Sequence, residues 1–278
     1  MNKIIGKVLS KLFPTYGLHT PNVVLNYFKR INKSEGANKY LFILSPPYCG
    51  STLLNELLST SPSVSVNNPY GTREGQTLPS VRKMMFDPEK RWDENVQFDW
   101  NFIKKEWRKY WDTNKAVLLE KSPPNIIRAA AINEAFQNAF FIIFHRNPYA
   151  HCESLIRRNN SSAKAAARFA IICLEQQKIN QSLALNSITI SYEGMTTTPN
   201  KFKKQIIEFI PEVNNINFNT EFAAHNFREK KMQIENLNPE KIKNLSQNQL
   251  DEINEVFFEH EELLKYFHYD LINRSLNQ

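Results

Sequence analysis

One stretch of the sequence has the residue types of an anion-binding loop. It follows an apolar run at residues 40–44 and reads Ser-Pro-Pro-Tyr-Cys-Gly-Ser-Thr-Leu-Leu over residues 45–54. The prolines turn the chain away from a strand, and Gly50 permits a left-handed or closely approached backbone. Backbone N–H groups and hydroxyls can then converge on an anion where a helix begins. The alternative is an ordinary strand-to-helix turn with a Ser/Thr N-cap. The residues that we expect to bind a phosphate are Pro47, Tyr48, Cys49, Gly50, Ser51, Thr52 and Leu53.

This loop differs from the P-loop that binds nucleoside triphosphates. The first glycine of that motif is missing, and Ser51 stands where the motif has its lysine. Without the lysine, little neutralises the phosphates while a γ-phosphoryl group is transferred. A P-loop nucleotide kinase is therefore kept only as an alternative function.

A second segment predicts another phosphate site. The apolar run at residues 140–145 leads into Arg146, and Asn-Pro at 147–148 then opens a helix. Ser154 and Arg158 are four residues apart and so share a helix face. An arginine fork with a neutral hydroxyl donor suits a phosphate, so we expect Arg146, Ser154 and Arg158 to bind one. The alternative is an arginine paired with a carboxylate beside an ordinary surface helix.

The spacing of apolar residues predicts the elements that must position these segments. Short apolar runs predict strands at residues 40–44, 64–66, 116–119, 140–145 and 187–191. Helical patterns begin at residue 52 and also cover residues 77–86, 100–112, 125–138, 148–158, 163–185, 200–210 and 248–266. Strands that alternate with helices predict a P-loop-like, three-layer α/β/α fold with a central, mostly parallel sheet. In such a sheet, ligands bind beyond the carboxyl ends of the strands.

The sequence divides into an N-terminal helical arm, residues 1–37, and a single α/β domain, residues 38–278. Residues 2–13 form an amphipathic pattern with lysines every four residues on one face. This helix either packs on the domain or contacts a membrane surface or a partner. Pro14 and Pro21 interrupt the pattern.

The amino-acid composition is that of a folded globular protein. The 278 residues are 41% hydrophobic and 23% charged, which excludes a disordered chain, a collagen-like repeat and a bare coiled coil. The apolar runs are too short for a membrane span. Three cysteines without C-x-x-C spacing predict a reducing compartment, and we expect a cytoplasmic protein. A net charge of +7 favours an anionic partner, although charge does not choose among nucleotide, nucleic acid and lipid surface.

The two phosphate segments together resemble the sulfotransferase superfamily that uses 3′-phosphoadenosine 5′-phosphosulfate (PAPS). Residues 47–54 resemble its 5′-phosphosulfate loop, and Arg146-Asn-Pro with Ser154 eight residues on resembles its 3′-phosphate motif. The resemblance implies in-line transfer of a sulfuryl group from PAPS to a hydroxyl or amine, with adenosine 3′,5′-bisphosphate as product and no metal. It implies no nucleic-acid partner. Sugars, phenols, peptide tyrosines and lipid head groups remain open as acceptors, and the oligomeric state is undetermined.

Three shorter matches imply further roles. Tyr192 lies in a segment similar to one that contacts the adenine, although a core tyrosine is an equal alternative. Lys121 follows a central strand, as does a lysine near the transferred group in the family; the alternative is a solvent-exposed strand cap. Glu74 lies in a stretch that resembles the one carrying the catalytic base of tyrosylprotein sulfotransferases, and the catalytic segments are most similar to these, Golgi-type and bacterial members. We therefore predict Glu74 as base, with an ordinary loop residue as the alternative, and Lys121 as the stabilising cation.

One departure from the family concerns charge. Many members have Arg or Lys where this chain has Tyr48. Lys121, or an arginine such as Arg73, would have to supply the missing charge; otherwise the chain is a degenerate sulfotransferase that binds a nucleotide without transfer. His145 and His151 are expected to be structural, and Cys49 a small filler. The tryptophans at 92, 100, 107 and 111 form either core or an acceptor wall.

Overall fold

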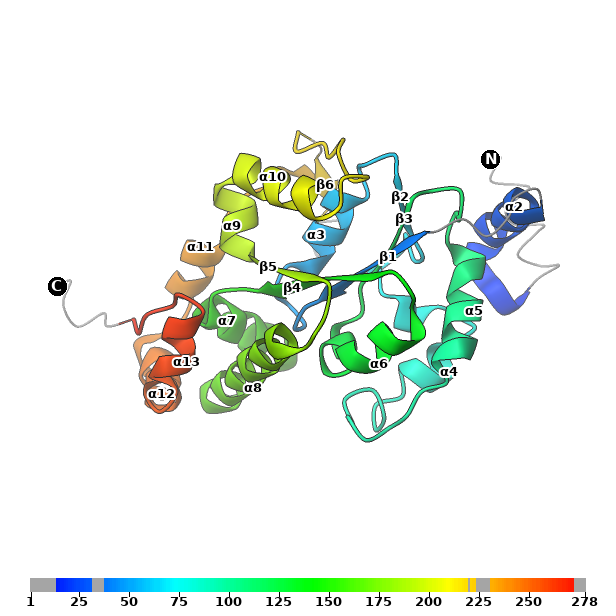
Figure 1. Cartoon of the computed structure of the whole chain (residues 1–278). Coiled ribbons are helices and arrows are strands. Elements are labelled where there is room, and N and C mark those ends of the chain that lie inside the picture. Colours follow the sequence, from blue (N-terminus) through cyan, green and yellow to red (C-terminus); the bar gives the residue numbers. More distant parts are fainter. Residues whose placement is uncertain (1–13, 32–37, 220, 224–230, 273–278) are drawn as a thin grey trace.

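Five parallel strands form the centre of the protein, in a computed structural model that describes residues 14–31, 38–219, 221–223 and 231–272 (Figure 1). The sheet order is β2-β3-β1-β4-β5, and every neighbouring pair is parallel. The strands are β1 Lys39–Leu44, β2 Val64–Val66, β3 Val117–Glu120, β4 Ala139–His145 and β5 Ser187–Ser191. All five predicted strands and the α/β class are confirmed.

Helices cover both faces of this sheet, which is why its strands are apolar throughout. On β1, Phe42 packs towards one layer and Ile43 towards the other. One layer contains α3 Ser51–Leu58, α9 Tyr192–Thr197 and α10 Pro199–Phe209 (Figure 1). The opposite layer contains α5 Trp100–Tyr110, α6 Ala129–Ala135, α7 Pro148–Asn159 and α8 Ala163–Ser182. The predicted three-layer architecture is therefore confirmed.

Some predicted helices are shorter than expected. Over residues 77–86 the helix is reduced to one turn, α4 Arg82–Met85. A 3-10 turn, η2 Gly75–Thr77, precedes it, and Pro79 lies between the two. The 125–138 pattern is split into the 3-10 segment η3 Pro123–Ile127 and α6. The C-terminal pattern is split into α12 Gln247–Phe258 and α13 Glu261–Tyr266, because His260 leaves the helical conformation.

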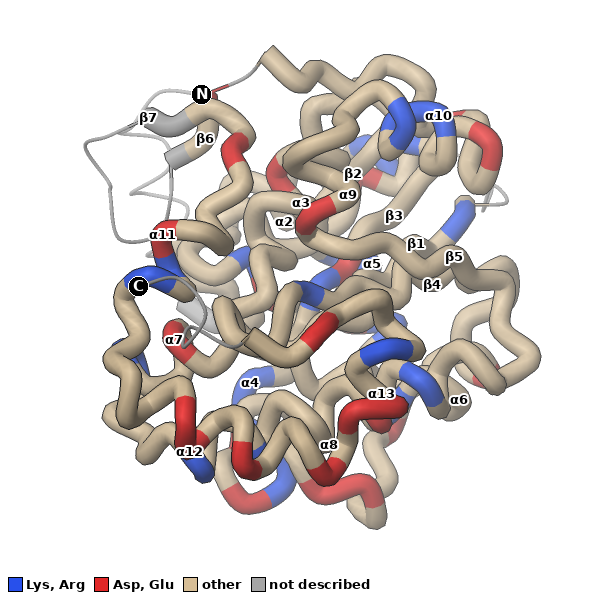
Figure 2. The backbone as a smooth tube through the Cα atoms, turned by 90° about the vertical axis from the view of Figure 1, so that its left-hand side faces the viewer, with Lys and Arg blue, Asp and Glu red and all other residues tan. Residues whose placement is uncertain are grey.

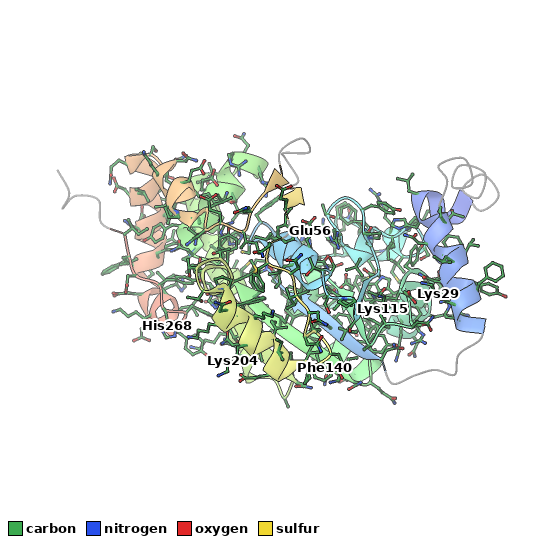
Figure 3. All side chains as sticks on the ribbon, turned by 90° about the horizontal axis from the view of Figure 1, so that it is seen from above. Lys29, Glu56, Lys115, Phe140, Lys204 and His268 are labelled. Atoms are coloured by element: carbon green, nitrogen blue, oxygen red, sulfur yellow. The ribbon has the colours of Figure 1, made fainter. Side chains whose placement is uncertain are left out.

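Pro21, which interrupts the pattern predicted over residues 2–13, opens a helix that was not predicted. After the 3-10 segment η1 Pro14–His19, helix α2 runs over Thr20–Ile31, and Pro21 occupies its first turn, where no intrahelical N–H is needed. Helix α2 packs on the body through Val23, which is buried, and through polar contacts: Asn26 donates to the Tyr110 carbonyl at 2.7 Å, and Lys29 pairs with Asp112 at 2.5 Å. Figure 3 shows Lys29 at the end of the molecule opposite His268. The helix predicted over residues 2–13 lies outside the described residues.

Three C-terminal elements were not predicted: α11 Asn238–Lys243 and the two-stranded antiparallel pair β6 Phe222–Ala223 and β7 Lys231–Met232. Helix α11 packs on α7, and α12 packs on α8. Acidic residues collect on α12 and α13, whereas basic residues collect on α10 (Figure 2). Among the described helices, none is both long and apolar enough to cross a bilayer.

Candidate active site

The loop after β1 reverses the chain through two residues in the left-handed region. Tyr48 has φ 64° and Gly50 has φ 94°, and α3 begins directly afterwards. A Cβ atom on Gly50 would lie 2.6 Å from Cδ2 of Tyr192. Position 50 therefore requires glycine for both its backbone conformation and its space.

Helix α3 begins without a side-chain N-cap hydrogen bond. Its first backbone N–H groups have no carbonyl one turn earlier to bind, so they are available to an anion. Ser51 is buried and Thr52 is half-buried at this end. The ordinary N-capped turn that the sequence left open is thus not what the chain forms.

Arg146 extends from the carboxyl end of the adjacent strand β4 and lies against this loop. Its guanidinium lies over the ring of Tyr192 with 4.0 Å from Cζ to the centroid, and its Nη1 donates to the Tyr48 carbonyl at 3.5 Å. Its Nε donates to Asn238 at 2.6 Å, and Nη2 is buried with no hydrogen-bond partner among the described residues. The guanidinium is therefore held by neutral groups, with one donor left for an anion.

Ser154 lies in the second turn of α7, next to a lysine that the sequence did not point to. Lys241 donates to Ser154 Oγ at 2.7 Å and to Glu153 at 2.7 Å. Burial lowers the pKa of Lys241, and the nearby positive charge of Arg146 adds to this effect, while Glu153 opposes it. Two cations and a hydroxyl thus meet between α7 and α11.

The contacts of Arg158 and Tyr192 could not be predicted from the sequence. Arg158 is exposed and lies over the ring of Tyr48, 5.3 Å from its centroid, and the Tyr48 hydroxyl donates to Asn159 at 2.8 Å. The Tyr192 ring is enclosed by Gly50 and Arg146. Its hydroxyl donates to the Glu235 carbonyl at 2.9 Å.

Lys121 joins the candidate base to the phosphate loop. It is 2% exposed, and its Nζ lies 3.4 Å from Glu74 Oε1 and 3.2 Å from Thr52 Oγ1. It also donates to the Thr72 carbonyl at 2.8 Å. Burial lowers the pKa of Lys121, and the Glu74 carboxylate acts in the opposite direction. The solvent-exposed strand cap is therefore not what the structure contains.

Glu74 is held in place by the elements around it. Gln76 donates to its Oε2 at 2.5 Å. The Gly75 N–H donates to Glu120 at 3.0 Å, and the Gln76 N–H donates to Ser122 at 3.0 Å. Burial raises the pKa of the Glu120 carboxyl to about 7 against the hydrogen bonds it accepts. The segment that carries Glu74 is thus fastened to the end of β3.

Arg73 lies elsewhere. Its Nε donates to Asn55 at 2.5 Å and its Nη2 to Ser59 at 3.0 Å, so it is bonded to the side of α3. Cys49 is the filler that was expected: burial raises the pKa of its thiol to about 12. Burial also lowers the pKa of His145 to about 4 and that of His151 to about 3, so both rings are neutral near pH 7.

Four residues that hold this site together were missed, because nothing in their local sequence marks them. Glu193 accepts from the Asn147 N–H at 2.8 Å, from the Asn238 amide and from Tyr269 at 3.1 Å. The missed residues are Glu193, Asn238, Lys241 and Tyr269.

The groove found elsewhere on the surface contains none of the candidate site residues. A groove of about 890 Å³ lies between α8 and the turn joining α12 to α13, lined by residues such as Lys178 and Phe258. Within the described part of the chain, no group of three His, Cys, Asp or Glu side chains could hold a metal ion. The expectation that no metal takes part stays a prediction.

The chain is an α/β protein in which the two predicted phosphate segments lie at neighbouring strand ends. A family model described as the sulfotransferase family matches residues 41–212, and the chain belongs to that family. The sulfotransferase STF9 from Mycobacterium avium shares the fold with a TM-score of 0.50 and 14% identity, over 94% of this chain and 84% of that one. A sulfotransferase from Alicyclobacillus acidocaldarius does so with a TM-score of 0.51 and 15% identity, over 85% of this chain and 98% of that one. A comparison with curated protein sequences finds no match.

Proposed function

We propose that this protein is a sulfotransferase that moves a sulfuryl group from PAPS to a hydroxyl or amine acceptor and releases adenosine 3′,5′-bisphosphate. The observation that carries the proposal is the contact between the two phosphate segments: the Arg146 guanidinium bonds the loop carbonyl of Tyr48 and keeps a buried donor without a partner. A doubly phosphorylated nucleotide suits this arrangement.

The residues present fit PAPS, which supplies the sulfuryl group when bound. The loop from Pro47 to Leu53, with the uncapped start of α3, would hold the 5′ end. Arg146 and Ser154, joined by Lys241, would hold the 3′-phosphate. Tyr192 would orient Arg146 and border the adenosine, and Arg158 would act from the rim.

The transfer needs a proton acceptor and a positive charge near the departing oxygen. Glu74 would take the acceptor proton as the new S–O bond forms. Lys121, which bridges Glu74 and the loop, would stabilise the electron pair left on the phosphate oxygen when the old S–O bond breaks. The acceptor itself is not defined by these residues.

Ligand-induced stabilisation tests the proposal. We expect adenosine 3′,5′-bisphosphate to raise the melting temperature more than adenosine 5′-monophosphate does, because only the former has a 3′-phosphate. In Arg146→Ala this difference should disappear, whereas in Arg168→Ala, an exposed arginine of α8, it should persist. Equal shifts in wild type and Arg146→Ala would overturn the proposal.

Further measurements on the same protein distinguish the sulfotransferase from the two alternative functions. Stronger stabilisation by ATP with Mg²⁺ would indicate a nucleotide kinase. Transfer of labelled sulfate from PAPS to acceptors, lost in Glu74→Gln and in Lys121→Ala, is expected for the active enzyme. Binding of the bisphosphate without any transfer would indicate a degenerate, nucleotide-binding member.

A further inference from the structure

The phosphate loop has no positive side chain of its own at Tyr48, and Arg73 is bonded to α3. Sulfuryl transfer places negative charge on the sulfuryl oxygens and on the leaving phosphate, and a single buried lysine, Lys121, contacts the loop through Thr52. A second cation from another segment is therefore needed to stabilise the negative charge on the sulfuryl oxygens and the leaving phosphate. The segment between α4 and α5 contains one.

This segment is fastened from one side by Arg128, which is 5% exposed. The Arg128 guanidinium donates to the carbonyls of Lys90 at 3.0 Å, Arg91 at 2.9 Å and Asp93 at 2.9 Å. It also donates to the Pro124 carbonyl at 3.3 Å. Pro124 is three residues after Lys121, so Arg128 fixes residues 90–93 against the chain that leaves β3.

Aromatic contacts fasten the same segment from the other side. The Trp92 ring meets Phe169 edge-on, with centroids 6.3 Å apart, and Phe169 meets His151 at 6.1 Å. His151 is buried on α7, and the backbone of Pro47, in the loop after β1, raises the pKa of His151 against the larger lowering by burial. Residues 90–93 therefore span from the end of β3 to the loop after β1.

Arg91 belongs to this segment. Its guanidinium lies over the rings of Phe86, at 4.4 Å, and Trp92, at 5.6 Å. Its Nε is buried and has no hydrogen-bond partner among the described residues. Burial lowers the pKa of Arg91, while the charges of Glu74 and Tyr48 oppose this, so both groups are within electrostatic reach. A buried cationic N–H without an acceptor is costly, and an anion in the site would satisfy it.

We propose that Arg91 is a catalytic residue that donates hydrogen bonds to the sulfuryl oxygens during transfer, and so supplies the charge that the loop lacks at Tyr48. The inference rests on the proposed function. The sulfuryl group passes from the phosphate oxygen to the acceptor oxygen, and the acceptor proton goes to Glu74. Arg91 keeps its own protons and only stabilises the charge.

Four variants test this assignment in the full-length protein. Arg91→Ala should lower kcat by about 10²-fold, as loss of one transition-state donor does elsewhere, without weakening adenosine 3′,5′-bisphosphate binding. Arg91→Lys should retain part of the rate. Tyr48→Arg combined with Arg91→Ala should recover at least about tenfold of it, because position 48 lies within electrostatic reach of Arg91. Arg82→Ala is the matched control, since Arg82 lies over the same Phe86 ring, at 5.2 Å, but is exposed.

A binding measurement gives a readout that does not need turnover. With saturating adenosine 3′,5′-bisphosphate, inorganic sulfate should raise the melting temperature of wild type and Arg82→Ala further, but not that of Arg91→Ala. The assignment would be overturned if Arg91→Ala changed only the acceptor KM or kept the full rate. It would also be overturned if Tyr48→Arg gave no rescue, or if sulfate stabilised Arg91→Ala as much as wild type. Failure of the proposed function would appear differently, as wild type that does not bind the bisphosphate.

Discussion

At the scale of single residues, the site depends on Gly50 and Tyr192 filling complementary space. The glycine turns the chain into α3, and the tyrosine ring lies where a side chain at position 50 would be. The Arg146 guanidinium lies over the same ring. One aromatic ring thus sets the separation between the two phosphate segments.

Gly50→Ala should therefore be more damaging than an ordinary glycine substitution. We expect it to lower the free energy of unfolding by about 3 kcal/mol, from backbone strain plus displacement of the Tyr192 ring, and to abolish stabilisation by adenosine 3′,5′-bisphosphate. Gly71→Ala is the control: φ is 56° and nothing lies within 4 Å of the added Cβ, so its cost should be about 1 kcal/mol. Urea unfolding measures both, and equal losses would contradict the argument.

The sequence predicted much of the candidate site, but not the residues that hold its side chains in place. The loop and Arg146 were visible in the sequence because their motifs are local. The partner of Ser154, Lys241, is 87 residues away, and Arg91 is placed by Arg128, 37 residues further on. Such contacts are set by tertiary packing, which no local spacing encodes.

At the scale of elements, the strands could be predicted because burial on both faces makes their sequences uniformly apolar. The helices were harder. Pro21 looks the same in the sequence whether it interrupts a helix or opens one, and Pro79 divides a pattern that otherwise continues. Helix α11 has too short an apolar pattern to be recognised, yet it carries two residues of the site, Asn238 and Lys241.

The end of strand β4 is joined to the C-terminal tail through a histidine. The Tyr269 hydroxyl donates to Glu193, so the neutral His145 ring donates its Nδ1 proton to the hydroxyl oxygen, at 2.7 Å. Burial, with His268 nearby, lowers the pKa of His145 from 6.5 to about 4. Between these two values the unfolded chain binds a proton that the folded protein does not, so acid reduces stability.

We expect His145→Asn, which keeps a donor at the Nδ1 position, to lessen this loss. On going from pH 8 to pH 5, wild type should lose about 2 kcal/mol more unfolding free energy than the variant. Burial of Glu120, which raises its pKa to about 7, gives a slope of opposite sign, but it acts equally in both proteins. Denaturant unfolding at the two pH values measures the difference, and parallel losses would show that His145 is not the group responsible.

At the scale of the whole molecule, the sheet order brings the carboxyl ends of β1, β3 and β4 side by side, so their loops share one edge. At the far end, α2 packs on the body through Val23 and Asn26, and large apolar side chains of η1 and α2 are exposed. These exposed residues are Leu18, Leu25, Tyr27 and Phe28.

Substitutions on the exposed side of α2 should therefore cost less stability than a substitution on its buried side. Leu25→Gln and Phe28→Gln should leave the melting temperature nearly unchanged, since these side chains are 48% and 62% exposed. Val23→Gln, at a position 6% exposed, should cost about 2 kcal/mol or more, because it places an amide in the core. Thermal unfolding compares the three. A large loss in both of the first two would mean that this face is covered.

The boundaries of the family match have a practical consequence for trimming the chain. Residues 41–212 contain both phosphate motifs, Glu74 and Lys121. A fragment cut to that range would nevertheless lack Asn238, which orients Arg146, and Lys241, which bonds Ser154. Such a fragment would keep every motif of the predicted site but would lose the two side chains that hold Arg146 and Ser154 in place.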